Sequence, residues 1–301
     1  MGEINTKLIA ENWKEELKLS VASLPTKPCL AIVVAKGYSD ASTKYVNNKI
    51  KVAKEIGIEI LLKEIEWEDR SKEDTYCELV NVISQLNLAD CVNGIIVQLP
   101  FVDIPEKDIS ELIEPSKDVD GFTSIQKGKL VDGDADTLIP CTALGIMRIL
   151  ENTHSNLNGK TMAIINRSNL IGKPLIQLAL NKNMTPIVVH TKTNYNSRVF
   201  ALNNSNIIVS GCGKRKLFNA YDIGNYVETI IDCSMTTQDG IKGVGDFDKE
   251  SILENKPNVS IASGYGHTGL TTVVALMNNV ILAYKNQMAK EKVDLWDLIK
   301  G

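Results

Sequence analysis

Short, continuous apolar runs recur along the whole chain and alternate with segments whose apolar residues have helical spacing. Two of these runs, in the first half, are "CLAIVVA" (29–35) and "GIIVQLP" (94–100). Strands that are apolar on both faces are typical of parallel sheets covered by helices. "KTMAIIN" opens the second half and is followed by four runs of the same kind, "TPIVVH", "SNIIVSG", "VETIIDC" and "NVSIAS". This alternation predicts an α/β fold with parallel sheets and right-handed crossovers.

A polar stretch over residues 115–140 divides the 301-residue chain, a length that favours two domains. We expect a first α/β domain over 1–140, which a C-terminal helical segment (269–301) rejoins, and a Rossmann-like parallel-sheet domain over 141–268. The long terminal helix is predicted over roughly 271–290, with a separate short piece near Trp296. The site is expected in a cleft between the two domains.

Composition excludes several classes of function. The net charge is −4 and no basic block is interleaved with aromatic residues, which argues against a nucleic-acid partner. No apolar run reaches membrane-spanning length and the N-terminus has no signal-peptide core, so a cytoplasmic protein without a membrane partner is expected. Six scattered cysteines without a CxxC pair indicate free thiols in a reducing compartment, and three isolated histidines predict no metal site.

The segment "NRSNLIGKP" (166–174) has the position of a phosphate-binding turn, because it follows a buried strand and opens a helix. Backbone N–H groups there are expected to face an anion. Asn166 stands where the first glycine of G-x-G-x-x-G belongs, and Gly172 closes the turn. Since Asn tolerates positive φ better than other non-glycine residues, we expect the turn to survive. A plain βα turn without a ligand is the alternative.

Two neighbouring features favour a dinucleotide. Arg167 lies in the turn, where its planar guanidinium could hold an additional phosphate. "HTKT" (190–193) follows the next strand, where an acidic residue would bind the ribose of NAD. Hydroxyl groups and a lysine stand there instead, so the sequence predicts NADP as the cofactor.

Four pieces elsewhere form an ordered set: "GYSDASTKYVNNK", "VQLP", "KDVDGF" and "PCT". Together with "RSNLIGKP" and "HTKT", they resemble the bifunctional methylenetetrahydrofolate dehydrogenase/methenyltetrahydrofolate cyclohydrolase family essentially from end to end. The resemblance implies an NADP-dependent oxidoreductase and hydrolase of one-carbon metabolism that serves purine biosynthesis. It also implies homodimerisation through the cofactor domain.

The resemblance assigns roles to individual residues. Lys49 is the catalytic amine, which Gln98 orients as a neutral partner, and Tyr45 stacks on the aminobenzoyl ring of the folate. Asp120 binds the pterin through a charge-assisted pair of hydrogen bonds. The remaining predicted residues of the substrate site are Leu99, Pro100 and Gly266. Those of the cofactor site are Asn166, Arg167, Ser168, Gly172, His190 and Thr191.

The chain departs from the family pattern on the cofactor side. A proline- and glycine-rich loop of the family is replaced by "SGYGHTGLTT" (263–272), in which no proline remains. A cyclohydrolase without dehydrogenase activity, or a non-catalytic folate- or nucleotide-binding paralogue, is therefore the alternative function. The Tyr-x-x-x-Lys spacing also occurs in short-chain dehydrogenases. In that family the glycine-rich turn precedes the pair, whereas here it follows.

Overall fold

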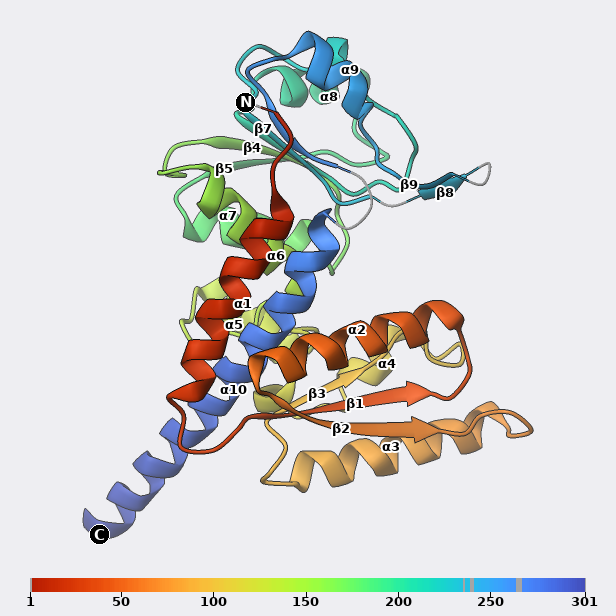
Figure 1. Cartoon of the computed structure of the whole chain (residues 1–301), viewed down its shortest axis with the longest axis vertical. Helices are drawn as coiled ribbons and strands as arrows, with labels where there is room; N and C mark the ends of the chain where they lie inside the picture. The colour runs from red at the N-terminus through yellow and green to blue at the C-terminus, as the bar shows by residue number, and fades with distance from the viewer. Residues whose placement is uncertain (1, 235, 239–240, 264–266, 301) are drawn as a thin grey trace. The chain divides into compact units, whose positions relative to one another are not determined.

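The computed structural model describes residues 2–234, 236–238, 241–263 and 267–300. The chain forms two compact units, which are treated separately (Figure 1). The first unit consists of Trp13–Cys141 and Val273–Gly301, and the second of Met1–Asn12 and Thr142–Thr272. The division falls within two helices, α1 (Thr6–Ala22) and α10 (His267–Lys300).

The first unit contains a three-stranded parallel sheet with the strand order β2-β1-β3. Figure 1 shows α2 and α3 on opposite faces of this sheet. The elements of the unit that lie between α1 and α10 are β1 (Cys29–Ala35), α2 (Asp40–Ile56), β2 (Glu59–Ile65), α3 (Lys72–Leu88), β3 (Gly94–Val97), α4 (Glu106–Ser110), η1 (Pro115–Lys117) and α5 (Ser124–Asp132).

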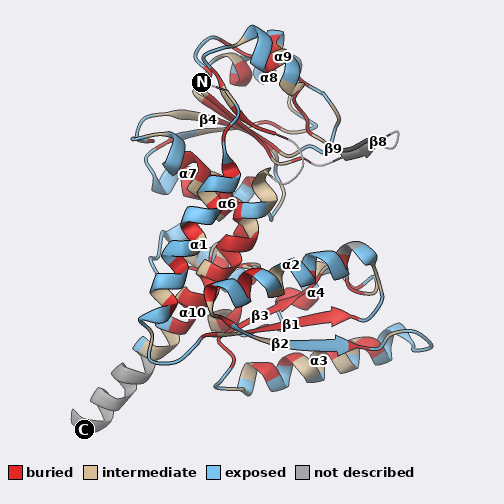
Figure 2. Ribbon diagram, in the orientation of Figure 1, coloured by how far each residue is buried: buried red, intermediate tan, exposed pale blue. Residues whose placement is uncertain are grey.

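Burial on both faces explains why β1 reads as a continuous apolar run. Ala31 and Val33 pack in one cluster with Leu79 and Ile83 of α3, while Leu30 is equally buried. Figure 2 shows the buried residues running along β1 and β3. The edge strand β2 is largely exposed, with only its last residue buried.

The second unit contains a five-stranded parallel sheet with the order β10-β7-β6-β4-β5, and a separate antiparallel hairpin of β8 and β9. The order places β4 in the interior, next to β6 on one side and β5 on the other, as in a doubly wound fold. The elements are α6 (Cys141–Thr153), β4 (Thr161–Ile165), α7 (Gly172–Asn181), β5 (Thr185–Val188), α8 (Tyr195–Asn203), β6 (Ile207–Ser210), η2 (Ala220–Asp222), β7 (Thr229–Asp232), β8 (Thr236–Gln238), β9 (Ile241–Val244), α9 (Lys249–Asn255) and β10 (Ser260–Ala262).

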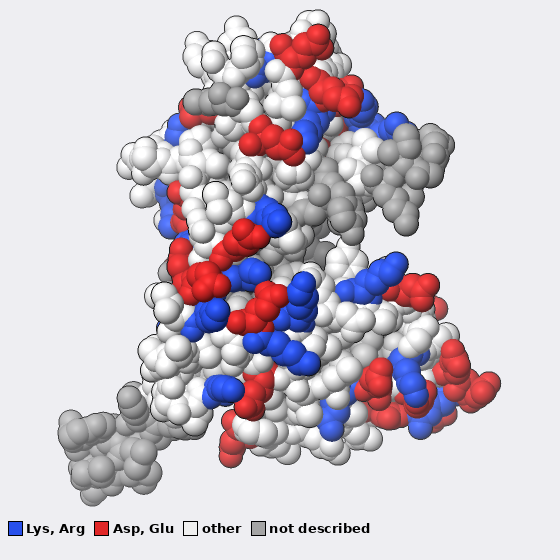
Figure 3. Space-filling view, viewed as in Figure 1, with Lys and Arg blue, Asp and Glu red and all other residues white. Residues whose placement is uncertain are grey.

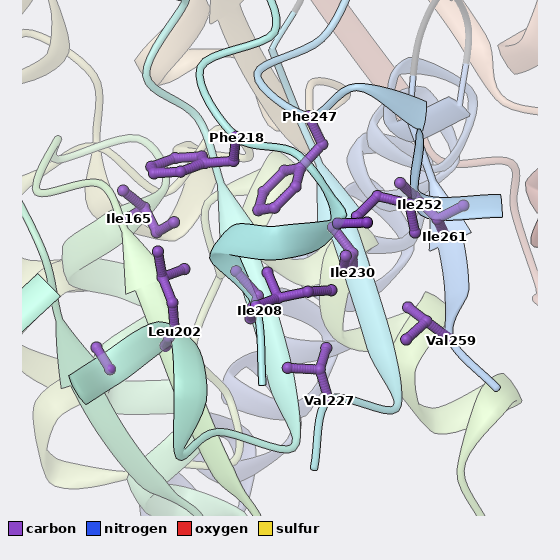
Figure 4. Packing of buried hydrophobic residues seen from close by; sticks show 14 of the residues in the cluster. Ile165, Leu202, Ile208, Phe218, Val227, Ile230, Phe247, Ile252, Val259 and Ile261 are labelled. Carbon is purple, nitrogen blue, oxygen red and sulfur yellow. The ribbon is translucent and has the colours of Figure 1, made fainter. Parts of the chain in front are cut away.

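One face of this sheet carries an apolar cluster that two aromatic rings cover. Phe218 and Phe247 lie 5.2 Å apart between ring centroids, above the side chains of Ile165, Ile208 and Ile230 (Figure 4). All five side chains are almost fully buried. Phe218 also lines a cavity at the carboxyl ends of the strands, so this apolar cluster forms part of the cavity wall.

The N-terminal segment adds a sixth partner to the sheet edge. Ile4 N–H donates to the Ile261 carbonyl at 2.8 Å, and Ile261 N–H donates to the Gly2 carbonyl at 2.9 Å. Glu3 therefore pairs in parallel with β10 and covers what would otherwise be an open edge.

The predicted α/β class with parallel sheets is confirmed. The terminal helix differs from the prediction, because α10 runs from His267 to Lys300 without the break expected before Trp296. The boundaries of 1–140, 141–268 and 269–301 stay a prediction about domains. The compact units differ from it in grouping residues 1–12 with the second unit.

The surface is mixed in charge on the face that Figure 3 shows, where acidic and basic side chains form small interspersed groups. In the described part of the chain, no helix has both the length and the apolar character needed to cross a membrane.

Candidate functional site

Lys49 and Tyr45 share one face of α2, one turn apart. The helix begins where the Ser39 hydroxyl accepts a hydrogen bond from Ser42 N–H, and it ends at Gly57, whose φ of 99° suits only glycine well. Lys49 is half-buried, and its ammonium nitrogen donates to Gln98 Oε1 at 3.0 Å. The Tyr45 side chain is 49 % exposed, which leaves its ring accessible for stacking.

Gln98 follows directly after β3, and two bonds fix its orientation. Its backbone N–H donates to the Val33 carbonyl at 2.8 Å, and its side-chain Nε2 donates to the Leu99 carbonyl at 2.7 Å. Because Nε2 is engaged, Oε1 is the atom that faces Lys49. Gln98 is only 9 % exposed, Leu99 is half-buried and Pro100, joined by a cis peptide bond, is exposed.

The "KDVDG" segment is held rigid by its own first two charged residues. Lys117 Nζ donates to three carbonyl oxygens, those of Leu86, Asn87 and Ala89. Asp118 accepts from the N–H groups of Gly121 and Thr123, and burial raises the pKa of its carboxyl to about 6. Neither residue was assigned a role from the sequence, although both lie within three residues before Asp120.

Asp120 follows these two anchoring residues, and among the described residues it forms no ion pair at contact distance. Burial raises the pKa of its carboxyl, and the positive charge of Lys49 opposes that shift. Its Oδ1 accepts a hydrogen bond from Cys141 Sγ at 3.7 Å. The structure thus brings Lys49, Gln98 and Asp120 into one electrostatic environment. Their predicted roles stay predictions.

Asn279 of α10 holds two backbone segments, the one just before Asp120 and the one just before α6. Its Nδ2 donates to the Val119 carbonyl at 2.8 Å and to the Ile139 carbonyl at 2.7 Å. The side chain is 1 % exposed, and its Oδ1 has no partner. Asn279 was missed in the sequence analysis. The available signal was a polar residue in the middle of the apolar run "VVALMNNVILAY".

Asn166 organises the predicted phosphate turn by a mechanism other than the expected one. Its φ is not positive, so the argument from left-handed backbone was wrong. Instead, its Oδ1 accepts from Ser168 N–H at 2.7 Å and Gly172 N–H at 3.1 Å, while its Nδ2 donates to the Gly211 carbonyl at 2.6 Å. The Asn166 side chain thus bonds backbone groups that a glycine at this position would leave without a side-chain partner.

Gly172 is required by close approach. A Cβ at this position would overlap the carbonyl group of Asn166 and the Cα of Arg167. The glycine therefore lets α7 begin directly against the turn. The Ser168 hydroxyl occupies a third amide, accepting from Ile171 N–H at 3.1 Å. Three turn amides, those of Ser168, Ile171 and Gly172, are thus bonded within the turn and do not face an anion, contrary to expectation for these three.

The carboxyl ends of β4, β5 and β6 border a cavity of about 520 Å³. The predicted residues that line it are Asn166, Arg167, Ser168, His190 and Thr191. Arg167 Nη2 approaches Thr191 Oγ1 to 3.5 Å. His190 Nδ1 accepts from Lys192 N–H at 3.1 Å, so in this geometry the ring proton of the neutral form is on Nε2.

Two cationic residues of this cavity, Arg198 and Lys214, were not predicted. The Lys214 turn is held by Asp246, whose carboxylate accepts from Lys214 N–H and Cys212 N–H at 2.7 Å each, and from the Ser210 hydroxyl at 2.6 Å. The signal in the sequence for Lys214 was its place shortly after the buried strand β6, whereas Arg198 lies within α8 and had no such signal. Gly266 lies outside the described residues.

Comparisons with known proteins match both halves of the chain. Residues 4–120 match the model of the tetrahydrofolate dehydrogenase/cyclohydrolase catalytic domain. Residues 140–288 match the NAD(P)-binding domain of the same family. A "Bifunctional protein FolD" of Campylobacter hominis is 36 % identical over 97 % of this chain and 100 % of its own length. One from Staphylococcus saprophyticus is 34 % identical over 94 % and 96 %.

Solved structures are similar over the same extent. The bifunctional FolD enzyme of Campylobacter jejuni has a TM-score of 0.86 and 32 % identity, covering 95 % of this chain and 99 % of its own. The Trypanosoma brucei methylenetetrahydrofolate dehydrogenase-cyclohydrolase, solved with NADP cofactor and an inhibitor, has a TM-score of 0.79 and 25 % identity, covering 95 % and 97 %.

Proposed function

Because the chain belongs to the tetrahydrofolate dehydrogenase/cyclohydrolase family, we propose that it catalyses both reactions that the family name states. The first transfers a hydride from the methylene carbon of 5,10-methylenetetrahydrofolate to NADP and leaves the 5,10-methenyl cation. The second adds water to that carbon, opens the ring to give 10-formyltetrahydrofolate and releases a proton.

The observation that carries this proposal is the contact between Lys49 Nζ and Gln98 Oε1 at 3.0 Å. An amine acting as general base must be aimed at the proton it removes. Gln98 supplies that aim, because its own amide is fixed by the Leu99 carbonyl. As a neutral acceptor, it orients the amine without the stabilisation of the ammonium form that a carboxylate would bring.

Asp120 and Tyr45 fit the two ends of a folate. Two carboxylate oxygens can accept a pair of parallel N–H groups, which is the donor pattern of the amino-pyrimidine edge of a pterin. Burial of Asp120 strengthens such bonds, since the competing water is removed. The exposed Tyr45 ring offers a face to the aminobenzoyl group.

The cavity of the second unit fits a phosphorylated dinucleotide. Its described lining holds Arg167, Arg198 and Lys214 and no carboxylate side chain. Arg167 and Thr191 are the residues that we propose to hold the 2′-phosphate, a group that distinguishes NADP from NAD. When bound, the nicotinamide supplies the hydride acceptor. The residues of this chain supply binding and orientation.

The test is a pair of variants on α2, Lys49→Met and Lys44→Met. Lys44 lies on the same helix and is exposed, so its variant controls for the loss of a positive charge. Both reactions are followed for each protein. We expect Lys49→Met to lose cyclohydrolase turnover while Lys44→Met keeps it. Wild-type turnover in Lys49→Met, or no NADP reduction by the wild-type protein, would contradict the corresponding half of the proposal.

We further propose that the protein is a cytoplasmic homodimer that provides one-carbon units for purine biosynthesis. Exposed large side chains on the second unit support a protein interface there, namely Tyr195, Phe200, Tyr221 and Tyr226. Light scattering of the purified protein tests the dimer: a single species with the mass of one chain would refute it.

A further inference from the structure

We propose that Arg198 is a second binding residue for the adenosine 2′-phosphate and thereby a determinant of NADP preference. This inference rests on the proposed dehydrogenase function, because it concerns how the same cofactor site distinguishes a phosphomonoester from a free 2′-hydroxyl group.

The first support is the charge of the cavity at the carboxyl ends of β4, β5 and β6. Arg198 lines it together with Arg167, and the described lining contains no carboxylate side chain. Among the described residues, neither arginine forms an ion pair. Two guanidinium groups that share one cavity repel each other unless an anion lies between them. The lining is therefore complementary to a ligand that carries more than one negative charge.

The second support is the position of Arg198 in the chain. The turn after β5 ends at Asn194, whose side chain caps α8 by accepting from Ser197 N–H at 2.9 Å. Arg198 directly follows Ser197 and is the fourth residue of the helix, at the end of its first turn. The same connection carries Thr191, which Arg167 approaches to 3.5 Å. One short segment thus presents a hydroxyl group and a guanidinium to the same cavity.

The third support is the state of the phosphate turn. The N–H groups of Ser168, Ile171 and Gly172 are bonded to the side chains of Asn166 and Ser168. They are not free to hold an anion in the way that an open glycine-rich turn would. Side-chain cations must therefore supply a larger share of the anion binding, and Arg198 is placed to do so.

The fourth support is the conformation of the Arg198 side chain. It is half-buried, and its Cζ lies 5.5 Å from the centroid of the Tyr195 ring. A guanidinium held against an aromatic face loses less freedom on binding than a solvated one. A phosphomonoester carries close to two negative charges at neutral pH and three acceptor oxygens, enough for both arginines. The phosphodiester-like groups of NAD carry one charge each.

The test compares 2′,5′-ADP with 5′-ADP by calorimetry, and the Michaelis constants of NADP with those of NAD. Arg198→Met keeps much of the length of the side chain and removes the guanidinium. Arg198→Lys keeps the positive charge and removes the planar pair of N–H donors. Lys182→Met is the matched control. Lys182 follows α7 and forms an exposed ion pair with Glu151, and it does not line the cavity.

We expect Arg198→Met to weaken 2′,5′-ADP binding and to raise the Michaelis constant of NADP by about ten- to a hundredfold, the range of a lost charged hydrogen bond. Binding of 5′-ADP and NAD should change less than about twofold. Arg198→Lys should lie between, and Lys182→Met should match the wild type.

Equal weakening of 2′,5′-ADP and 5′-ADP would overturn the inference in favour of adenine stacking, and unchanged binding of both would overturn it outright. Failure of the proposed function has a different signature. A wild-type protein without turnover that still binds 2′,5′-ADP through Arg198 would refute the activity and keep this inference.

Discussion

Replacing Asn166 by alanine removes three hydrogen bonds that close the nucleotide turn onto the neighbouring strand end. These bonds join Asn166 to Ser168 N–H (2.7 Å), Gly172 N–H (3.1 Å) and the Gly211 carbonyl (2.6 Å). At roughly 1 kcal/mol of net stability for each bond, the loss is about 3 kcal/mol. For a unit of this size, that corresponds to a fall of about 10 °C in its melting temperature.

Calorimetric melting measures this loss, because a chain of two compact units need not unfold in a single two-state transition. We expect Asn166→Ala to lower the melting temperature of one transition, and to raise the Michaelis constant of NADP more than that of the folate. Asn169→Ala is the control in the same turn, since within the described part of the chain the Asn169 side chain bonds only to the exposed Lys173 ammonium, at 2.8 Å.

An Asn166→Ala protein that melts with the wild-type profile would refute the reasoning, because it would mean that these three bonds contribute no net stability. A protein that melts at a lower temperature but keeps the wild-type Michaelis constant of NADP would separate the turn from cofactor binding. It would then leave Asn166 as a structural residue only.

Three further predictions concern single positions. Gly172→Ala should raise the Michaelis constant of NADP and lower the melting temperature, because the added Cβ overlaps the Asn166 carbonyl; a fully stable Gly172→Ala protein would show that the turn can move. Asn279→Leu should raise the Michaelis constant of the folate more than that of NADP and cost about 3 kcal/mol, since it leaves the Val119 and Ile139 carbonyls unpaired; steady-state kinetics and urea unfolding measure both. The His154 pKa is lowered by burial and by Lys160, against the opposing effect of Glu228, so below about pH 6.5 the unfolded chain binds more protons than the folded one. The contribution of His154 to the free energy of unfolding should therefore fall as the pH drops from 7 to 5, and His154→Gln should remove that contribution. Asp118 and Asp232, whose carboxyl pKa values are raised to about 6, act in the opposite direction: the stability they contribute is present at low pH and is lost as the pH rises through about 6. The difference between wild type and His154→Gln is consequently the quantity to measure, and equal slopes would contradict the assignment.

The strands were predictable because their signal is local. The run "CLAIVVA" is β1 from its first residue to its last, and burial on both faces of a parallel sheet is what produces such a run. The helix α5 was not predicted, since it spans only nine residues inside a polar stretch. The unbroken course of α10 was also missed, because its later part, "NQMAKEKVDLWDLIK", is too polar to indicate continued packing.

The residues of the candidate site likewise divide into those that local motifs indicate and those that only the folded chain brings together. Lys49 and Gln98 could be paired from motifs, and their contact joins α2 to the residue that directly follows β3. The partner of Asn166 could not be found, because Gly211 lies 45 residues further along the chain and is brought close only by the β4–β6 pairing. Arg198 carried no motif at all, since its role depends on which side of α8 borders the cavity.

The self-bonded loop at residues 166–172 has a consequence for how a ligand is received. A glycine-rich loop samples many backbone states when free, and binding must freeze them. Here the hydrogen bonds of Asn166 already fix the backbone of the turn. Binding of a nucleotide should therefore cost little conformational entropy and rearrange the backbone little. The amide protons of Ser168 and Gly172 should accordingly exchange slowly with deuterated solvent even before any nucleotide is added.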